Sequence, residues 1–161
     1  MLQEVKKACV HPALFSVFCL GLISAPVMAQ DTESVEGEAF EANIFEVFLG
    51  GTFDDGESNA SFGLSYERRL KESFGIGGLV EYTNGREWIY AVPLTVHINE
   101  SWKVMVAPGF EHAEGENNYL TRVGTAYDFK FDGFALAPEA NLDFVDGDTK
   151  VVVGVCFVIE F

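Results

Sequence analysis

The sequence predicts an all-β fold, an eight-stranded antiparallel up-and-down transmembrane β-barrel. After its N-terminal region the chain divides into about eight stretches of roughly ten residues in which apolar side chains take alternate positions. Aromatic residues lie at the ends of most of these apolar faces. No later stretch has the ~18 uninterrupted apolar residues of a membrane helix. A sheet that spans lipid must be closed, because lipid offers no partners to free backbone groups.

The first 29 residues have the pattern of a cleavable secretory signal peptide. Lys6 and Lys7 precede an apolar run over 13–27, and small residues follow up to Ala29, where we expect cleavage. Residues 30–39 are acidic and polar, and we interpret them as a periplasmic lead-in. The predicted barrel domain covers residues 40–161.

Charge and cysteine content narrow the class of protein. The formal net charge of −15 argues against a nucleic-acid partner, because such proteins present basic surfaces. Two of the three cysteines lie in the predicted signal peptide, which leaves Cys156 with no partner for an intramolecular disulfide. We expect no cofactor and no metal.

Period-two alternation of apolar residues defines the expected strands. In chain order they cover 41–53, 60–70, 74–83, 86–98, 102–111, 119–131, 134–144 and 151–161. The first is ambiguous in phase, since Phe45, Val47 and Leu49 share one face while Ile44 and Phe48 share the other. The remaining apolar faces, in order, begin with Phe62, Leu64 and Tyr66; Phe74, Ile76 and Val80; Trp88, Tyr90 and Val92; Trp102, Val104 and Val106; Tyr119, Val123 and Tyr127; Phe134, Leu136 and Leu142; and Val151, Val153 and Val155.

The opposite faces are rich in Gly, Ala and Ser but also hold charges, which decides which face points inward. Eight strands enclose too little space for this many aromatic rings. The rings therefore belong outside, against lipid, and Tyr and Trp suit the headgroup region. Pro93, Pro108 and Pro138 fall within expected strands, and we expect a bulge or break at each because proline lacks a ladder donor.

Turn residues separate the strands and suggest an orientation. With an even strand count and a periplasmic C-terminus, the turns at 71–73, 99–101 and 132–133 are periplasmic. The loops at 54–59, 84–87, 112–118 and 146–149 then face outward, and most of them are acidic. Asn84-Gly85 is a strong hairpin signal.

The whole expected barrel resembles the small eight-stranded outer-membrane β-barrel superfamily, the group with the outer-membrane protein A, X and W types. The hairpin from Tyr66 to Gly77 and the terminal aromatic strand carry this resemblance. It implies an outer-membrane protein of a Gram-negative bacterium in contact with outer-membrane lipid or lipopolysaccharide. It also implies that the barrel-assembly machinery reads the last strand through Val155, Phe157, Ile159 and Phe161. No subfamily signal is present, and we expect a monomer.

The inward faces carry ionisable residues that must pair, because an unpaired buried charge is costly. We expect a structural charge network that plugs the lumen, formed by Glu67, Arg69, Glu81, His97, Lys103, Glu111, Arg122, Asp128, Glu139 and Asp143. The predicted role is therefore structural or surface-interacting, without enzymatic activity.

Three other readings stay open. The polar lumen could be a narrow, porin-like conduit for small solutes or cations. The protein could modify lipid A, because related deacylases place a His and a Ser near the rim; here His112 is followed two residues later by Glu114 in place of the Ser. A soluble periplasmic barrel is the last possibility.

Overall fold

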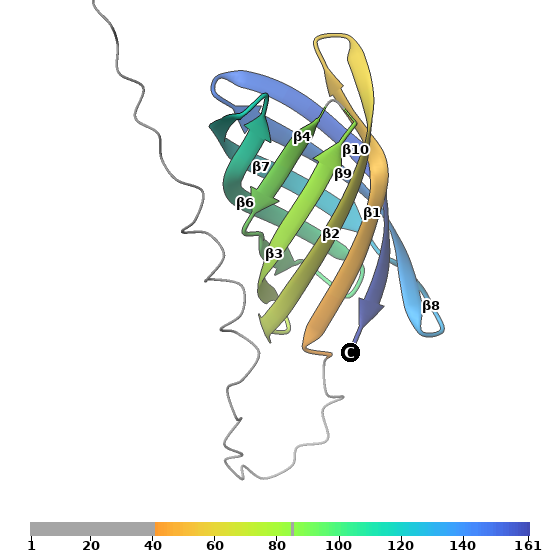
Figure 1. The fold of residues 1–161 in the computed structure, drawn as a ribbon. Coiled ribbons are helices and arrows are strands. Elements are labelled where there is room, and N and C mark those ends of the chain that lie inside the picture. The colour runs from red at the N-terminus through yellow and green to blue at the C-terminus, as the bar shows by residue number, and fades with distance from the viewer. Residues whose placement is uncertain (1–40, 85) are drawn as a thin grey trace, which may run out of the picture. The chain divides into compact units, whose positions relative to one another are not determined.

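The computed structural model describes residues 41–84 and 86–161, so the predicted signal peptide (1–29) and lead-in (30–39) lie outside the described residues. The described chain forms one antiparallel sheet that curves round and closes (Figure 1). Its strands are β1 (Asn43–Asp54), β2 (Glu57–Lys71), β3 (Phe74–Thr83), β4 (Glu87–Ala91), β5 (Leu94–His97), β6 (Trp102–Ala113), β7 (Glu116–Tyr127), β8 (Phe129–Phe131), β9 (Phe134–Val145) and β10 (Asp148–Glu160).

The sheet closes because β1 pairs with both β2 and β10. The backbone N–H groups of Asn43 and Phe161 donate to each other's carbonyl oxygens at 2.9 Å, which joins the two ends of the barrel domain. β4 and β5 form one barrel strand, and β7 and β8 form another, so the described strands build the predicted eight-stranded antiparallel barrel. We call the end of the barrel with Asn43 and Phe161 the terminal end, and the opposite end the far end.

Side chains alternate between the two faces of the barrel wall as expected. In β9 and β10 the outward Leu142 and Phe157 are about two-fifths exposed, while the inward Asp143 and Cys156 are buried. The pairing settles the phase of β1, because Ile44 and Phe48 are buried inside whereas Phe45 and Leu49 are exposed outside.

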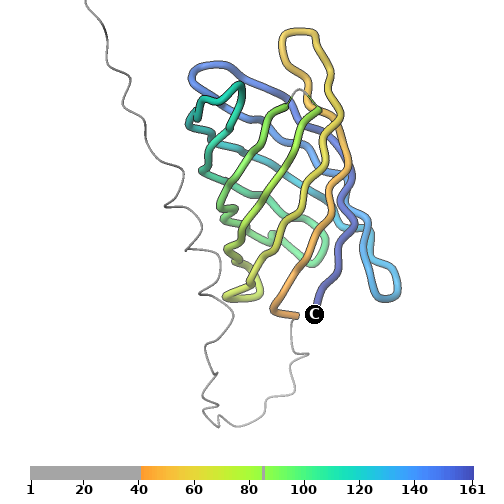
Figure 2. The backbone as a smooth tube through the Cα atoms, viewed as in Figure 1, coloured from red at the N-terminus to blue at the C-terminus, as the bar shows by residue number. Residues whose placement is uncertain are grey.

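The outer hairpins are tighter than the sequence suggested. The expected loops at 54–59, 112–118 and 146–149 shrink to two-residue turns whose residues have positive φ, as in type I′ turns: Asp55-Gly56, Glu114-Gly115 and Asp146-Gly147. β2, β7 and β10 therefore start three residues earlier than predicted. Once a tight turn brings two strands together, their backbone pairing extends into the polar residues next to the turn. Figure 2 shows these narrow chain reversals.

Only one of the three prolines interrupts its own strand. Pro93 separates β4 from β5, as predicted. Pro108 and Pro138 lie inside the unbroken strands β6 and β9 with no shift in register, so the prediction of a bulge or break there is wrong. Pro108 and Pro138 instead each lie opposite a gap in a neighbouring strand. Val92, just after β4, donates to the Pro108 carbonyl oxygen at 2.9 Å, and Pro138 lies opposite the gap between β7 and β8. A missing N–H weakens the partner's ladder while the proline's own strand continues.

No helix among the described residues is long and apolar enough to cross a membrane.

Candidate functional site: the charged interior of the barrel

The middle of the lumen contains one arginine held by two carboxylates, which we call the central cluster: Arg122, Glu81 and Asp143. The Arg122 guanidinium donates through Nε and Nη2 to the two oxygens of Asp143 at 2.6 and 2.7 Å. Its Nη1 donates to Glu81 Oε2 at 2.6 Å. All three side chains are almost completely buried. The fork of Arg matches a carboxylate with two parallel bonds, so the geometry is that of a strong buried pair.

This cluster comes from three strands that the sequence separates widely. Glu81 lies on β3, Arg122 on β7 and Asp143 on β9. Asp143 faces Arg122 directly in the β7–β9 register, while Glu81 reaches Arg122 across the lumen. The interaction therefore ties opposite walls of the barrel together.

A second group lies toward the terminal end, the terminal cluster: Glu46, Lys103, Asp128 and the pair Glu67–His97. Lys103 Nζ bonds the Glu46 carboxylate and lies 3.4 Å from Asp128 Oδ1. Glu46 also accepts from Ser65 at 2.8 Å. His97 Nε2 lies 2.7 Å from Glu67 Oε1.

The third group lies toward the far end, the far cluster: Lys150 with Glu111, Glu87 and Asp54. Lys150 Nζ lies 2.8 Å from Glu111, 3.1 Å from Glu87 and 3.9 Å from Asp54. Three carboxylates around one ammonium leave an acidic surplus at this end. The inward hydroxyls of Thr52, Ser61 and Thr83 form a hydrogen-bonded row at 2.7 and 3.1 Å.

Two of the ten predicted network residues have other surroundings. Glu139 accepts from Asn141 Nδ2 at 2.6 Å and from the Cys156 thiol at 3.0 Å. Arg69 is half-buried and donates to the Glu72 carbonyl oxygen in the β2–β3 turn. The other eight lie in the three clusters.

The sequence reasoning missed three acidic members. Glu46 lies on β1, whose phase was ambiguous, although it shares the even-numbered face with the inward Ile44 and Phe48. Asp54 and Glu87 were taken as parts of loops, whereas the structure places them at strand ends where they reach Lys150.

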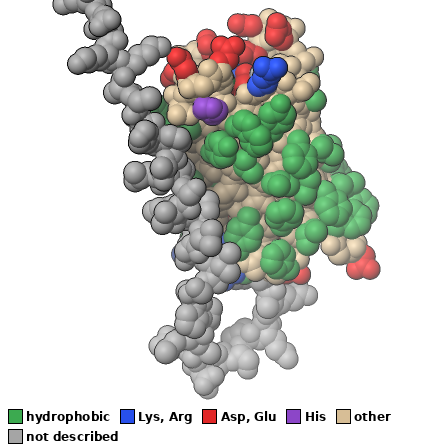
Figure 3. Space-filling model, in the orientation of Figure 1, with side chains coloured by type: hydrophobic (Ala, Val, Ile, Leu, Met, Phe, Trp, Pro, Cys, Tyr) green, Lys and Arg blue, Asp and Glu red, His purple; other side chains and the backbone are tan. Residues whose placement is uncertain are grey.

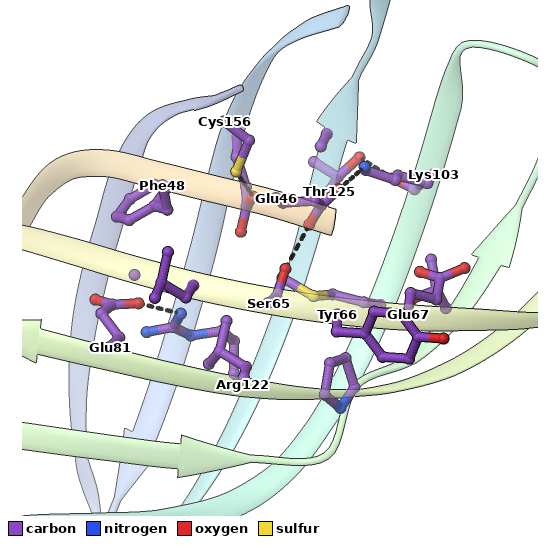
Figure 4. Close-up of a pocket in the computed structure, with 18 residues that line it drawn as sticks. Glu46, Phe48, Ser65, Tyr66, Glu67, Glu81, Lys103, Arg122, Thr125 and Cys156 are labelled. Carbon is purple, nitrogen blue, oxygen red and sulfur yellow. Dashed lines mark hydrogen bonds and ion pairs between the residues drawn. The ribbon is translucent and has the colours of Figure 1, made fainter. Parts of the chain in front are cut away.

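The space left between these side chains is small. A cavity of about 30 Å³ lies between the terminal and central clusters, lined among others by Glu46, Ser65, Lys103, Arg122 and Cys156 (Figure 4). One water molecule needs about 10–15 Å³ of such volume, so the cavity holds about two waters.

The outer wall has the opposite character. Large apolar side chains on every barrel strand are between about one-third and three-quarters exposed, and in the view of Figure 3 they cover the flank of the barrel while acidic side chains gather at one end. Neighbouring rings also contact one another, as in Phe134 with Phe157, whose centroids are 5.2 Å apart. A continuous apolar band around a charged interior reverses the arrangement of a soluble barrel.

The remaining candidate residues lie outside the three clusters. His112 is exposed, and its Nδ1 lies 2.8 Å from Asn117 Oδ1. The Asp146-Gly147-Asp148 segment is a tight hairpin turn. Among the described residues, no group of three or more His, Cys, Asp or Glu side chains is arranged to hold a metal ion.

No protein-family model and no curated protein matches the chain. Solved structures do. A de novo designed transmembrane β-barrel is similar with a TM-score of 0.51 and 13% identity, over 72% of this chain and 95% of the design.

The chain has the fold of the small eight-stranded transmembrane β-barrels. Two natural proteins are similar at lower scores. Ail, an outer membrane protein of Yersinia pestis, has a TM-score of 0.49 and 13% identity over 74% of this chain and 99% of Ail. The outer membrane enzyme PagL has a TM-score of 0.48 and 14% identity over 73% of this chain and 99% of PagL.

Proposed function

We propose that this chain is an integral outer-membrane protein with a structural or surface-interaction role, whose lumen is plugged by its own ion pairs. The observation that carries the proposal is the reversed polarity of the wall. Rings such as Phe62, Phe144 and Phe157 are exposed outside, while Glu81, Arg122 and Asp143 are buried inside.

The reversal makes sense only against hydrocarbon. Exposed apolar patches on soluble monomers rarely exceed a few hundred Å², whereas here such side chains occur on every barrel strand. Lipid favours these contacts, and closure of the barrel by β1 and β10 gives the backbone groups of those strands partners within the sheet.

The packed lumen favours a structural role over a conduit. A path through the barrel would have to pass the central cluster, where Arg122 bridges β9 and, across the lumen, β3. Removing a charge from such a buried group costs several kcal/mol. The cavity of about 30 Å³ has room for water but not for a hydrated ion or solute.

Orientation follows from the same proposal. The terminal end faces the periplasm, and the acidic turns at Asp55-Gly56, Glu114-Gly115 and Asp146-Gly147 face the exterior. Any surface interaction would then involve this acidic rim.

Two measurements test the proposal. Folded protein in detergent gels should migrate differently from the heated protein, and cell fractionation should recover it with the outer membrane. Unshifted migration and recovery in the soluble periplasm would support a soluble barrel instead.

Planar bilayers separate the plug from the conduit. We expect no discrete conductance from the native barrel. The variant with Glu81→Ala, Arg122→Ala and Asp143→Ala removes the central cluster and is expected to conduct more than the native protein. Regular cation-selective steps from the native protein would overturn the plug and leave the membrane barrel intact.

A further inference from the structure

The outward surface of β2, β3 and β4 is grooved rather than smooth. A depression of about 300 Å³ is lined by Phe62, Leu64, Val80, Tyr82 and Trp88. The register arranges these side chains in rows across the strands. Phe62, Tyr82 and Trp88 form an aromatic row near the far end, and Leu64 and Val80 form an aliphatic row next to it.

The following row contains a gap. Tyr66 pairs with Gly78, which is exposed, and a β-carbon on Gly78 would have no neighbour within 4 Å. The outer wall therefore has an open position next to the aliphatic row. The far end of the depression is bounded by a wall of rings, since the centroids of Tyr82 and Trp88 lie 4.9 Å apart.

We propose that this groove binds one acyl chain of an anionic lipid, which makes it a specific lipid site within the otherwise general lipid-facing band. The inference rests on the proposed function, because it requires this face to lie in a membrane.

The dimensions fit a single chain from one leaflet. The distance from Gly78 to Tyr82 along β3 is about 14 Å at ~3.4 Å per residue. The hydrocarbon core of a bilayer is ~30 Å thick, so the groove is about as long as one leaflet is deep.

Charge identifies the head group. The turn after β3 contains Arg86, two residues before Trp88 and so at the aromatic end of the groove. The hairpin turns at this end otherwise carry acidic residues, among them Asp55, Glu114 and Asp146. An arginine in the turn at this end of the apolar groove favours an anionic head group at this position. Tyr82 and Trp88 are the residue types that lie at the level of the head groups.

The chain contains two tryptophans, which makes the site measurable. Trp88 lines the groove, whereas Trp102 lies at the terminal end on β6, where its Nε1 donates to Thr125 Oγ1 at 2.7 Å. Trp102→Phe leaves Trp88 as the sole reporter, and Trp88→Phe leaves Trp102 as the reference. Each variant is reconstituted in phosphatidylcholine vesicles that contain a minor fraction of either phosphatidylglycerol or phosphatidylcholine with brominated chains, and quenching is compared.

Brominated phosphatidylglycerol should quench Trp88 at about one-fifth of the concentration that brominated phosphatidylcholine requires, because one arginine beside an anionic lipid favours it about fivefold. Trp102 should respond equally to both lipids. Arg86→Gln should remove the preference at Trp88. Val80→Phe fills the groove and should lower Trp88 quenching by both lipids, while Val106→Phe, an equally outward change on β6, should not.

The outcomes separate the two proposals. If neither tryptophan is quenched, the protein does not sit in the bilayer and the proposed function fails. If both are quenched with the same lipid preference, or if Val80→Phe has no more effect than Val106→Phe, the barrel is in the membrane and the groove site is refuted. Gel migration of each unheated variant verifies that it is folded.

Discussion

A β-carbon on Gly77 would lie 2.2 Å from the carbonyl oxygen of Tyr66 on the adjacent strand. The two strands pack so closely here that only glycine fits on the inward side of β3. The next residue, Gly78, points outward and has open space around the same position. Of these two successive glycines, Gly77 has no room for a side chain, whereas Gly78 has room for one.

Gly77→Ala should destabilise the barrel by about 2 kcal/mol, because backbone atoms cannot yield without moving a strand. Gly78→Ala is the matched control and should change stability by less than about 0.5 kcal/mol. Urea unfolding in detergent, followed by tryptophan fluorescence, measures both. Equal effects of the two substitutions would contradict the close approach of β2 and β3.

Arg122→Met should destabilise the barrel by about 3 kcal/mol, because it leaves Glu81 and Asp143 buried without a cation. Adding Glu81→Gln and Asp143→Asn should restore much of that loss, since the neutral amides need no counter-charge. Unfolding midpoints of the single and triple variants provide the measurement.

Lys130→Met is the control for that experiment. Lys130 is nearly half exposed and lies 3.8 Å from Glu160, so its removal should cost less than about 1 kcal/mol. If Lys130→Met lowers the free energy of unfolding as much as Arg122→Met does, burial does not determine how much an ion pair contributes to stability.

Phe161→Ala should reduce assembly in cells without weakening the folded barrel. The ring is exposed on the outer wall, while the backbone of Phe161 stays paired with Asn43. We expect a several-fold lower amount in the outer membrane and an unchanged unfolding midpoint after refolding in detergent. Phe131→Ala, with a similarly exposed ring, should assemble normally. If both variants assemble equally well, the last strand carries no special signal.

The alternation of side chains was sufficient to predict the closed barrel and the direction of most inward charges. The period of two is a local property, so each strand shows its two faces within its own residues. Which face of β1 points into the lumen could not be read from the residues of β1 alone. Phe48 turns inward because its ring lies over Gly50 and over Gly154 of β10, where β-carbons would come within 2.4 and 2.5 Å of it. That fit depends on a strand about one hundred residues later.

The partners inside the lumen could not be predicted for a similar reason. Arg122 is 41 residues from Glu81, and Lys150 is 63 residues from Glu87. Which charges meet depends on the register between strands and on the curvature of the wall. The strand breaks opposite Pro108 and Pro138 likewise required knowledge of the neighbouring strand.

The thiol of Cys156 is buried in the lumen, where it donates a hydrogen bond to the Glu139 carboxylate. Its reactivity can therefore be used to measure opening of the barrel. A thiol-reactive dye added from solution reaches this sulfur only when β10 separates from a neighbour or the lumen floods. In a chain cleaved after Ala29, Cys156 is the remaining cysteine. At dye concentrations where the reaction is faster than reclosing, the rate of labelling then reports how often the barrel opens.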